Sequence, residues 1–148
     1  MKTIFDNTAR VELINRINLL NESSTPRWGK MNIYQMLKHC TLWEEMVLGR
    51  VKCRRIFIGR LFGKMALKSI LNNEKPMMRN AITSPELKVK ESTGNVASER
   101  TKWIALIQEQ ARFSNHNFVH PFFGKMTKEQ IGYFIYKHTD HHLKQFNC

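Results

Sequence analysis

The sequence is poor in the features that mark disulfide-stabilised, cysteine-metal and membrane-spanning proteins. Its three cysteines, Cys40, Cys53 and Cys148, are an odd number and show no CxxC spacing. This argues against a disulfide scaffold and against a cysteine-built zinc site. The apolar runs are far shorter than a membrane span, and the N-terminal MKTIFDNTARVEL lacks the apolar core of a secretory signal. We therefore expect a cytoplasmic protein without a membrane partner.

Acidic residues are also scarce. There are 12 Asp and Glu against 24 Lys and Arg, which gives a formal net charge of +12. Such a field attracts anions, whether nucleic acid, phospholipid or a small acidic substrate, and composition alone does not choose among them. The length of 148 residues and a hydrophobic content of 42% are typical of one globular domain, so we expect a single domain over residues 1–148.

Glycine and proline are few, 7 and 4 residues, and lie mostly between segments of helical periodicity. No segment alternates as a strand should, so we predict an all-α antiparallel helix bundle. Residues 72–94 read as a long connection with little regular structure, which suggests a crossover or a functional lid. The predicted helices run from about Asp6 to Asn21, Asn32 to Gly49, Arg54 to Leu71, Val96 to Phe113 and Thr127 to Phe146.

The last predicted helix carries two histidines in its apolar stripe. Positions 131, 134, 135, 138, 142 and 146 share one side at a period of 3.6 residues, and all except His138 and His142 are apolar. Both imidazoles should therefore point inward. At this i,i+4 spacing their Cβ atoms lie roughly 6 Å apart, which suits two nitrogens on one metal ion. The alternative is a buried pair that hydrogen-bonds to Tyr, Gln or backbone groups.

A third ligand would strengthen the metal interpretation, and His39 is the first candidate. It lies at the edge of the apolar stripe of the second predicted helix. A lone histidine there is more often a hydrogen-bonded core residue, so the case for His39 depends on the other pair. Three histidines would leave a zinc-like ion one open position, as in catalytic sites. His116 and His120, in the loop before the last helix, are rival ligands.

Three stretches together resemble the DinB/YfiT-like superfamily of metal-dependent helix-bundle proteins, and specifically its DUF-type branch of small proteins. The stretches are WGKMNIYQMLKHC (28–40), NEKPMMRNAITSPELKV (73–89) and HPFFGKMTKEQIGYFIYKHTDHHLKQF (120–146). They cover the first helical hairpin, the crossover and the last helix. The rest of the chain matches by general pattern.

The resemblance implies a four-helix bundle of the up-down-down-up type, whose long crossover carries a short extra helix at about 54–71. It also implies a divalent metal ion, zinc or nickel, held by His39, His138 and His142. Family members of known chemistry include transferases and isomerases that use low-molecular-weight thiols such as bacillithiol or mycothiol. A thiol cofactor is therefore an expectation for this chain as well.

Our leading functional hypothesis is a metal-dependent enzyme, a thiol-dependent transferase or hydrolase acting on a small substrate. Glu44, five residues after His39, is the predicted general base, unless it is simply solvated. Cys40 could supply a thiolate, although a free cysteine in an apolar stripe is more often a buried hydrophobe. Residues that could orient the imidazoles through hydrogen bonds are Gln35, Glu44, Tyr133 and Asp140.

Two other classes of function remain open. A basic stretch could bind nucleic acid or another anion, because Phe57 and Phe62 lie among its charges. Periodicity predicts that these aromatics face the core, and no nucleic-acid motif is visible, so we do not favour nucleic acid; the stretch could instead steer an anionic substrate. The third class is a non-catalytic metal-binding module. A homodimer could form through an apolar strip that includes Trp28, Trp43 or Trp103. The basic stretch consists of Arg50, Lys52, Arg54, Arg55, Arg60, Lys64 and Lys68.

Overall fold

The computed structural model describes residues 1–72 and 75–148, and these are mostly helical. Each of the five predicted helices is present. The predicted crossover (72–94) and the motif piece 73–89 include residues 73 and 74, which lie outside the described residues. The helices are α1 (Asn7–Leu19), α2 (Ile33–Val47), α3 (Phe57–Leu71), α4 (Val96–Glu109) and α5 (Lys128–Gln145). There are two short 3-10 turns: η1 (Pro85–Leu87) lies within the crossover, and η2 (Gln110–Arg112) follows α4.

Side-chain caps fix where the helices begin. The carboxylate of Asp6 accepts a hydrogen bond from the Ala9 amide at the start of α1. Asn32 with Gln35 forms a reciprocal capping box before α2, and Thr127 with Gln130 forms the same motif before α5. Each box satisfies two amide groups that the first helical turn leaves unpaired. The two helices that carry the predicted ligands therefore have firmly defined starts.

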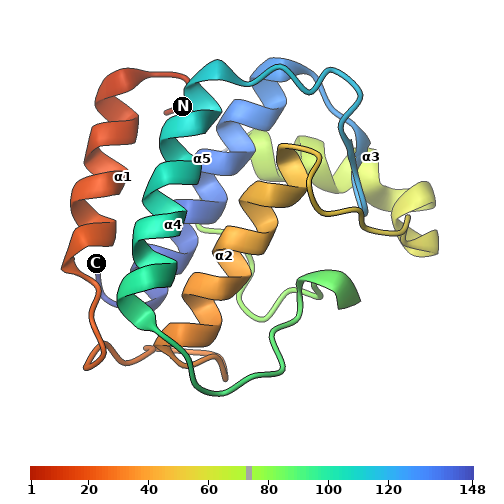
Figure 1. The fold of residues 1–148 in the computed structure, drawn as a ribbon. Coiled ribbons are helices and arrows are strands. Elements are labelled where there is room, and N and C mark those ends of the chain that lie inside the picture. Colours follow the sequence, from red (N-terminus) through yellow and green to blue (C-terminus); the bar gives the residue numbers. More distant parts are fainter. Residues whose placement is uncertain (73–74) are drawn as a thin grey trace.

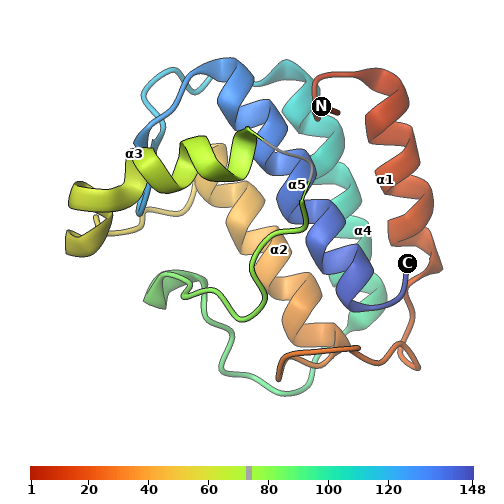
Figure 2. The ribbon, with the colours of Figure 1, turned by 180° about the vertical axis from the view of Figure 1, so that it is seen from behind.

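Four helices lie side by side and enclose the core. Following the colours in Figure 1, α1 and α5 run in one direction and α2 and α4 in the other, with α3 lying across one end. Figure 2 shows the same arrangement from behind, with the described part of the crossover passing in front of α2 and α5. Fully buried side chains from all four helices meet between them, among them Ile17, Leu37, Trp103 and Ile135. Among the described residues, no helix is both long and apolar enough to cross a membrane.

The burial of α3 differs from the expectation that its aromatics face the core. Phe57 is 74% exposed and Phe62 is 49% exposed, so this prediction was wrong. The helix packs instead through Gly59 and Gly63, where an added Cβ would lie 2.4 and 2.2 Å from the Phe122 carbonyl oxygen. Periodicity located an apolar stripe correctly, but the glycines offer the closer approach, so the opposite face docks.

A small antiparallel hairpin is a second difference from the prediction. Strands β1 (Val119–His120) and β2 (Gly124–Lys125) pair in the loop that the sequence marked with Pro121 and Gly124. Each strand has two residues, too few for an alternating pattern to be visible. The hairpin supports α3, because the loop between its strands is where the two glycines dock.

Candidate metal centre

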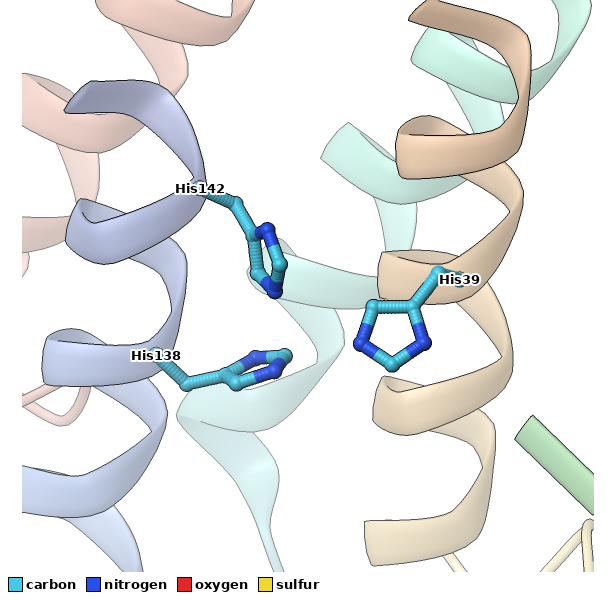
Figure 3. Close-up of side chains that lie close together, drawn as sticks. All are labelled: His39, His138 and His142. Carbon is cyan, nitrogen blue, oxygen red and sulfur yellow. The ribbon is translucent and has the colours of Figure 1, made fainter. Parts of the chain in front are cut away.

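Three histidines from two helices converge in the interior of the protein. Figure 3 shows His39 of α2 pointing toward His138 and His142 of α5. One ring nitrogen of each lies within 4.8 Å of the other two. The ring centroids of His138 and His142 are 4.7 Å apart, and they lie 5.6 and 5.1 Å, respectively, from that of His39. All three side chains are buried, as the apolar stripes of the two helices predicted.

A backbone carbonyl sets the protonation of the His39 ring. Its Nδ1 lies 3.0 Å from the carbonyl oxygen of Leu87, in the turn η1 of the crossover. A carbonyl can only accept, so Nδ1 must carry the proton. In the neutral ring the lone pair is then on Nε2, which is the atom left for a metal ion.

His142 is oriented by a side-chain amide that is itself fixed. Its Nδ1 lies 2.9 Å from Oε1 of Gln145. The other end of that amide, Nε2, donates to the carbonyl oxygen of Trp28 at 2.8 Å, which determines which way the amide points. Nδ1 of His142 is therefore the donor, and its Nε2 also carries a free lone pair. This contact joins the WGKM stretch to the last helix at the site.

Aromatic packing, rather than a hydrogen bond, positions His138. The ring stacks on the indole of Trp43, with centroids 4.4 Å apart and planes inclined by 23°. Phe134 stacks on it at 6.3 Å. Within residues 1–72 and 75–148, no hydrogen bond to its ring nitrogens is present. Both nitrogens therefore remain available to a ligand.

The environment keeps the three rings neutral. Burial lowers the pKa of His39, and it lowers the pKa of His142 to about 3 with a further contribution from His39. Burial, followed by the neighbouring His142 and His39, holds the pKa of His138 well below its ordinary value. A metal ion binds unprotonated imidazole, so the lowered pKa values keep the three rings in the form that can bind one. Three neutral nitrogen donors suit zinc, nickel and related divalent ions.

Glu44 lies on another side of α2 from His39. Five residues separate them, which is about 140° around a helix. The buried carboxylate accepts a hydrogen bond of 2.7 Å from Nε2 of Gln110, at the end of α4. Burial raises its pKa to about 8, although the hydrogen bond from Gln110 opposes the rise. The structure brings the three histidines together and does not bring Glu44 into that group, and its role as general base stays a prediction.

The other predicted residues lie in different settings. His116 is exposed, and His120 lies in the hairpin, where its Nδ1 accepts from the amides of Phe122 and Phe123. Cys40 is fully buried beside Met36, and burial raises the pKa of its thiol well above the ordinary value. This is the environment of a packed hydrophobe rather than of a reactive thiolate.

The residues that orient the imidazoles were not those expected from the sequence. Gln35 is occupied in the α2 capping box, and Asp140 pairs with Arg16 and Lys144 on the surface. Gln145 was detectable in principle, because it lies three residues after His142 and so on the same helix face. The Leu87 carbonyl had no sequence signal, since any residue supplies the same backbone oxygen.

A comparison with known families agrees with the geometry. The family model of the DinB superfamily matches residues 12–146, a range that includes all three histidines. No curated protein and no solved structure matches the chain.

Proposed function

Because the chain belongs to the DinB superfamily, we propose that it is a metal-dependent enzyme whose ion, zinc or nickel, is held by His39, His138 and His142. The observation that carries the proposal is the fixed state of the rings. Two of the three have Nδ1 committed to an acceptor, so their Nε2 lone pairs are free inside a buried cluster. A merely structural trio would be expected to satisfy both nitrogens of each ring with hydrogen bonds.

Three protein ligands would leave a bound divalent ion with an open position for a further group. When bound, such an ion would polarise a substrate oxygen or lower the pKa of a water or thiol to near neutrality. His39 and His142 would hold and orient the bound ion through their fixed tautomers. Trp43 would form the apolar wall behind His138. We infer a thiol-dependent transferase or hydrolase with a small and, given the positive charge, anionic substrate.

Glu44 is kept as the proposed general base, with one requirement. A carboxyl group with a pKa of about 8 is mostly protonated at neutral pH. It would have to lose that proton before it could accept one, for example when a cation binds nearby. Glu44→Gln separates the roles: a general base would lose turnover in this variant while metal content stayed unchanged.

For the fold we propose the finer description as well. Helices α1, α2, α4 and α5 lie side by side and form one bundle in up-down-down-up order. Helix α3 belongs to the crossover between α2 and α4. The core shared by all four supports a single domain over residues 1–148. Its location in the cytoplasm and a homodimeric state also remain proposals. Trp43 and Trp103 are buried in the core, so they cannot belong to the apolar dimer strip that the sequence suggested.

Metal analysis tests the site. Protein purified without a histidine tag should contain about one divalent ion per chain after incubation with zinc or nickel and gel filtration. His138→Ala should lose it, because two ligands hold a divalent ion poorly. His116→Ala is the matched control, since it removes an exposed histidine outside the cluster and should retain full occupancy. Stoichiometric metal in His138→Ala would reject the ligand assignment.

Turnover is tested separately. The loaded protein would be assayed with bacillithiol, mycothiol and glutathione against small electrophilic substrates, beside the His138→Ala variant. Thiol consumption that requires the metal would support the transferase proposal. A protein that binds metal stoichiometrically and turns over none of these substrates would support the non-catalytic binding module instead.

A further inference from the structure

The outward side of α3 exposes large hydrophobic side chains to solvent. Five large hydrophobic residues on this helix are between 49% and 74% exposed, and we call them the α3 outer face. Their spacing places them within about 140° of one another around the helix. Exposed apolar surface of this extent usually marks an interaction site. The residues are Phe57, Ile58, Leu61, Phe62 and Met65.

The structure holds this face outward. The buried side of α3 consists of Gly59, Gly63 and Leu67. Both glycines touch the backbone of Phe122, so no larger residue would fit at either position. Lys64 donates to the carbonyl of Lys125, and Lys137 donates to the carbonyl of Ile70 near the end of the helix. The helix is therefore clamped at its inner side, and rotation that would bury the outer face is blocked.

Positive charge borders the apolar surface along one edge. Arg60, Lys64 and Lys68 are exposed and follow one another at helical spacing beside the outer face. Residues 50–71 contain no Asp or Glu. Within the described residues no carboxylate pairs with these three side chains. An apolar stripe flanked by unneutralised cations is typical of a helix that lies in a membrane interface.

We propose that α3 docks on an anionic bilayer surface, with the outer face among the acyl-chain ends and the basic edge against the headgroups. This needs no membrane-spanning helix, and it replaces our expectation of no membrane partner. A second copy of the chain fits less well. Antiparallel pairing of two α3 helices places like flanks together, so the basic edges would face each other between chains of charge +12.

Vesicle co-sedimentation of the full-length protein tests the proposal. The vesicles would be pure phosphatidylcholine, and phosphatidylcholine with 30 mol% phosphatidylglycerol, each at low and at high salt. Binding is expected with the anionic vesicles and should weaken as salt screens the basic edge. Leu61→Glu should reduce the partition coefficient roughly tenfold or more, because the apolar contribution of Leu61 is lost and a charge is added.

Two controls make the outcome decisive. Leu19→Glu alters a leucine of similar exposure, 66% against 67%, on α1, and should bind like the unmodified chain. Circular dichroism would verify that each variant folds, as exposed positions should allow. The proposal fails if the chain ignores anionic vesicles, or if Leu61→Glu and Leu19→Glu bind equally. It also fails if light scattering shows a dimer that Leu61→Glu dissociates, since the face would then belong to a second copy.

Discussion

Burial raises the pKa of Glu44 and lowers the pKa of His120, so that both groups favour their neutral forms. Gln110 donates to one oxygen of Glu44, while its own Oε1 is buried and has no partner among the described residues. With its pKa raised to about 8, Glu44 is mostly neutral at physiological pH.

The raised pKa of Glu44 predicts a loss of stability with rising pH. Its pKa of about 8 in the folded protein exceeds the ordinary 4.5, so between these values the folded state holds a proton that the unfolded state lacks. The stability that protonated Glu44 adds to the folded state is fully present below about pH 4.5 and is lost as pH rises toward 8. Glu44→Gln should remove this pH dependence. Its free energy of unfolding, taken relative to that of the unmodified protein, should be a few kcal/mol higher at pH 9 than at pH 4. Urea unfolding at both pH values measures it, and an identical pH dependence in the two proteins would contradict it.

His120 predicts the opposite trend. Its Nδ1 accepts hydrogen bonds from the amides of Phe122 and Phe123 at 3.1 and 3.2 Å, which requires that nitrogen to be unprotonated. Burial, with a smaller effect of Arg55, lowers its pKa to about 3. Between pH 6.5 and 3 the unfolded chain therefore binds a proton that the folded protein does not, and stability falls as pH falls.

The test of this trend is His120→Asn, which keeps an acceptor in place of Nδ1 but does not titrate. Its free energy of unfolding should depend less steeply on pH between 4 and 6.5, by up to about 1.4 kcal/mol per pH unit. Urea titrations would include a chelator, so that His39, His138 and His142 are metal-free in both proteins. His116→Asn, at an exposed position, should keep the original slope, and a slope equally steep in His120→Asn would refute the argument.

At the scale of the helices, the sequence correctly predicted the capping boxes, but it predicted the buried face of each helix only in part. Thr127 with Gln130 placed the start of α5, and the stripe through His138 and His142 correctly gave their inward orientation. The apolar stripe of α3 gave a wrong prediction of its buried face. Periodicity shows which residues share a face, but it does not show which face packs against the rest of the protein. That choice depended on the loop around Phe122, which is distant in sequence.

Gly59→Ala tests how α3 docks. In an exposed helix this change would stabilise by about 1 kcal/mol. Here the new Cβ would lie 2.4 Å from the Phe122 carbonyl oxygen and 2.7 Å from its Cα, so the helix or the hairpin must shift. We expect a net destabilisation of about 1–3 kcal/mol in urea unfolding. Lys68→Ala, exposed on the same helix, should change stability by less than about 0.5 kcal/mol. A more stable Gly59→Ala protein would show that α3 is not tightly docked.

At the scale of the whole molecule, the candidate site is where distant parts of the chain meet. His39 and His138 are 99 positions apart, and the rings are oriented from two further places, the Leu87 carbonyl and the Trp28 carbonyl that fixes Gln145. The three histidines and the helices that carry them were predictable from spacing and resemblance. The orienting groups were not, because backbone carbonyls carry no residue identity.

An ion at this junction would tie α2 to α5, and its removal should be felt by the whole fold. A ligand that binds only the folded state adds about 2.7 kcal/mol at 100 times its dissociation constant, or roughly 5–10 °C in the unfolding midpoint for this size. Chelator-treated protein should therefore melt lower, and added zinc should restore the midpoint with one cooperative transition, as a single domain requires. Differential scanning calorimetry would measure both. The zinc-dependent rise should vanish in His138→Ala and persist in His116→Ala; equal rises in the two variants would place the ion elsewhere, and two separate transitions would divide the chain into independent units.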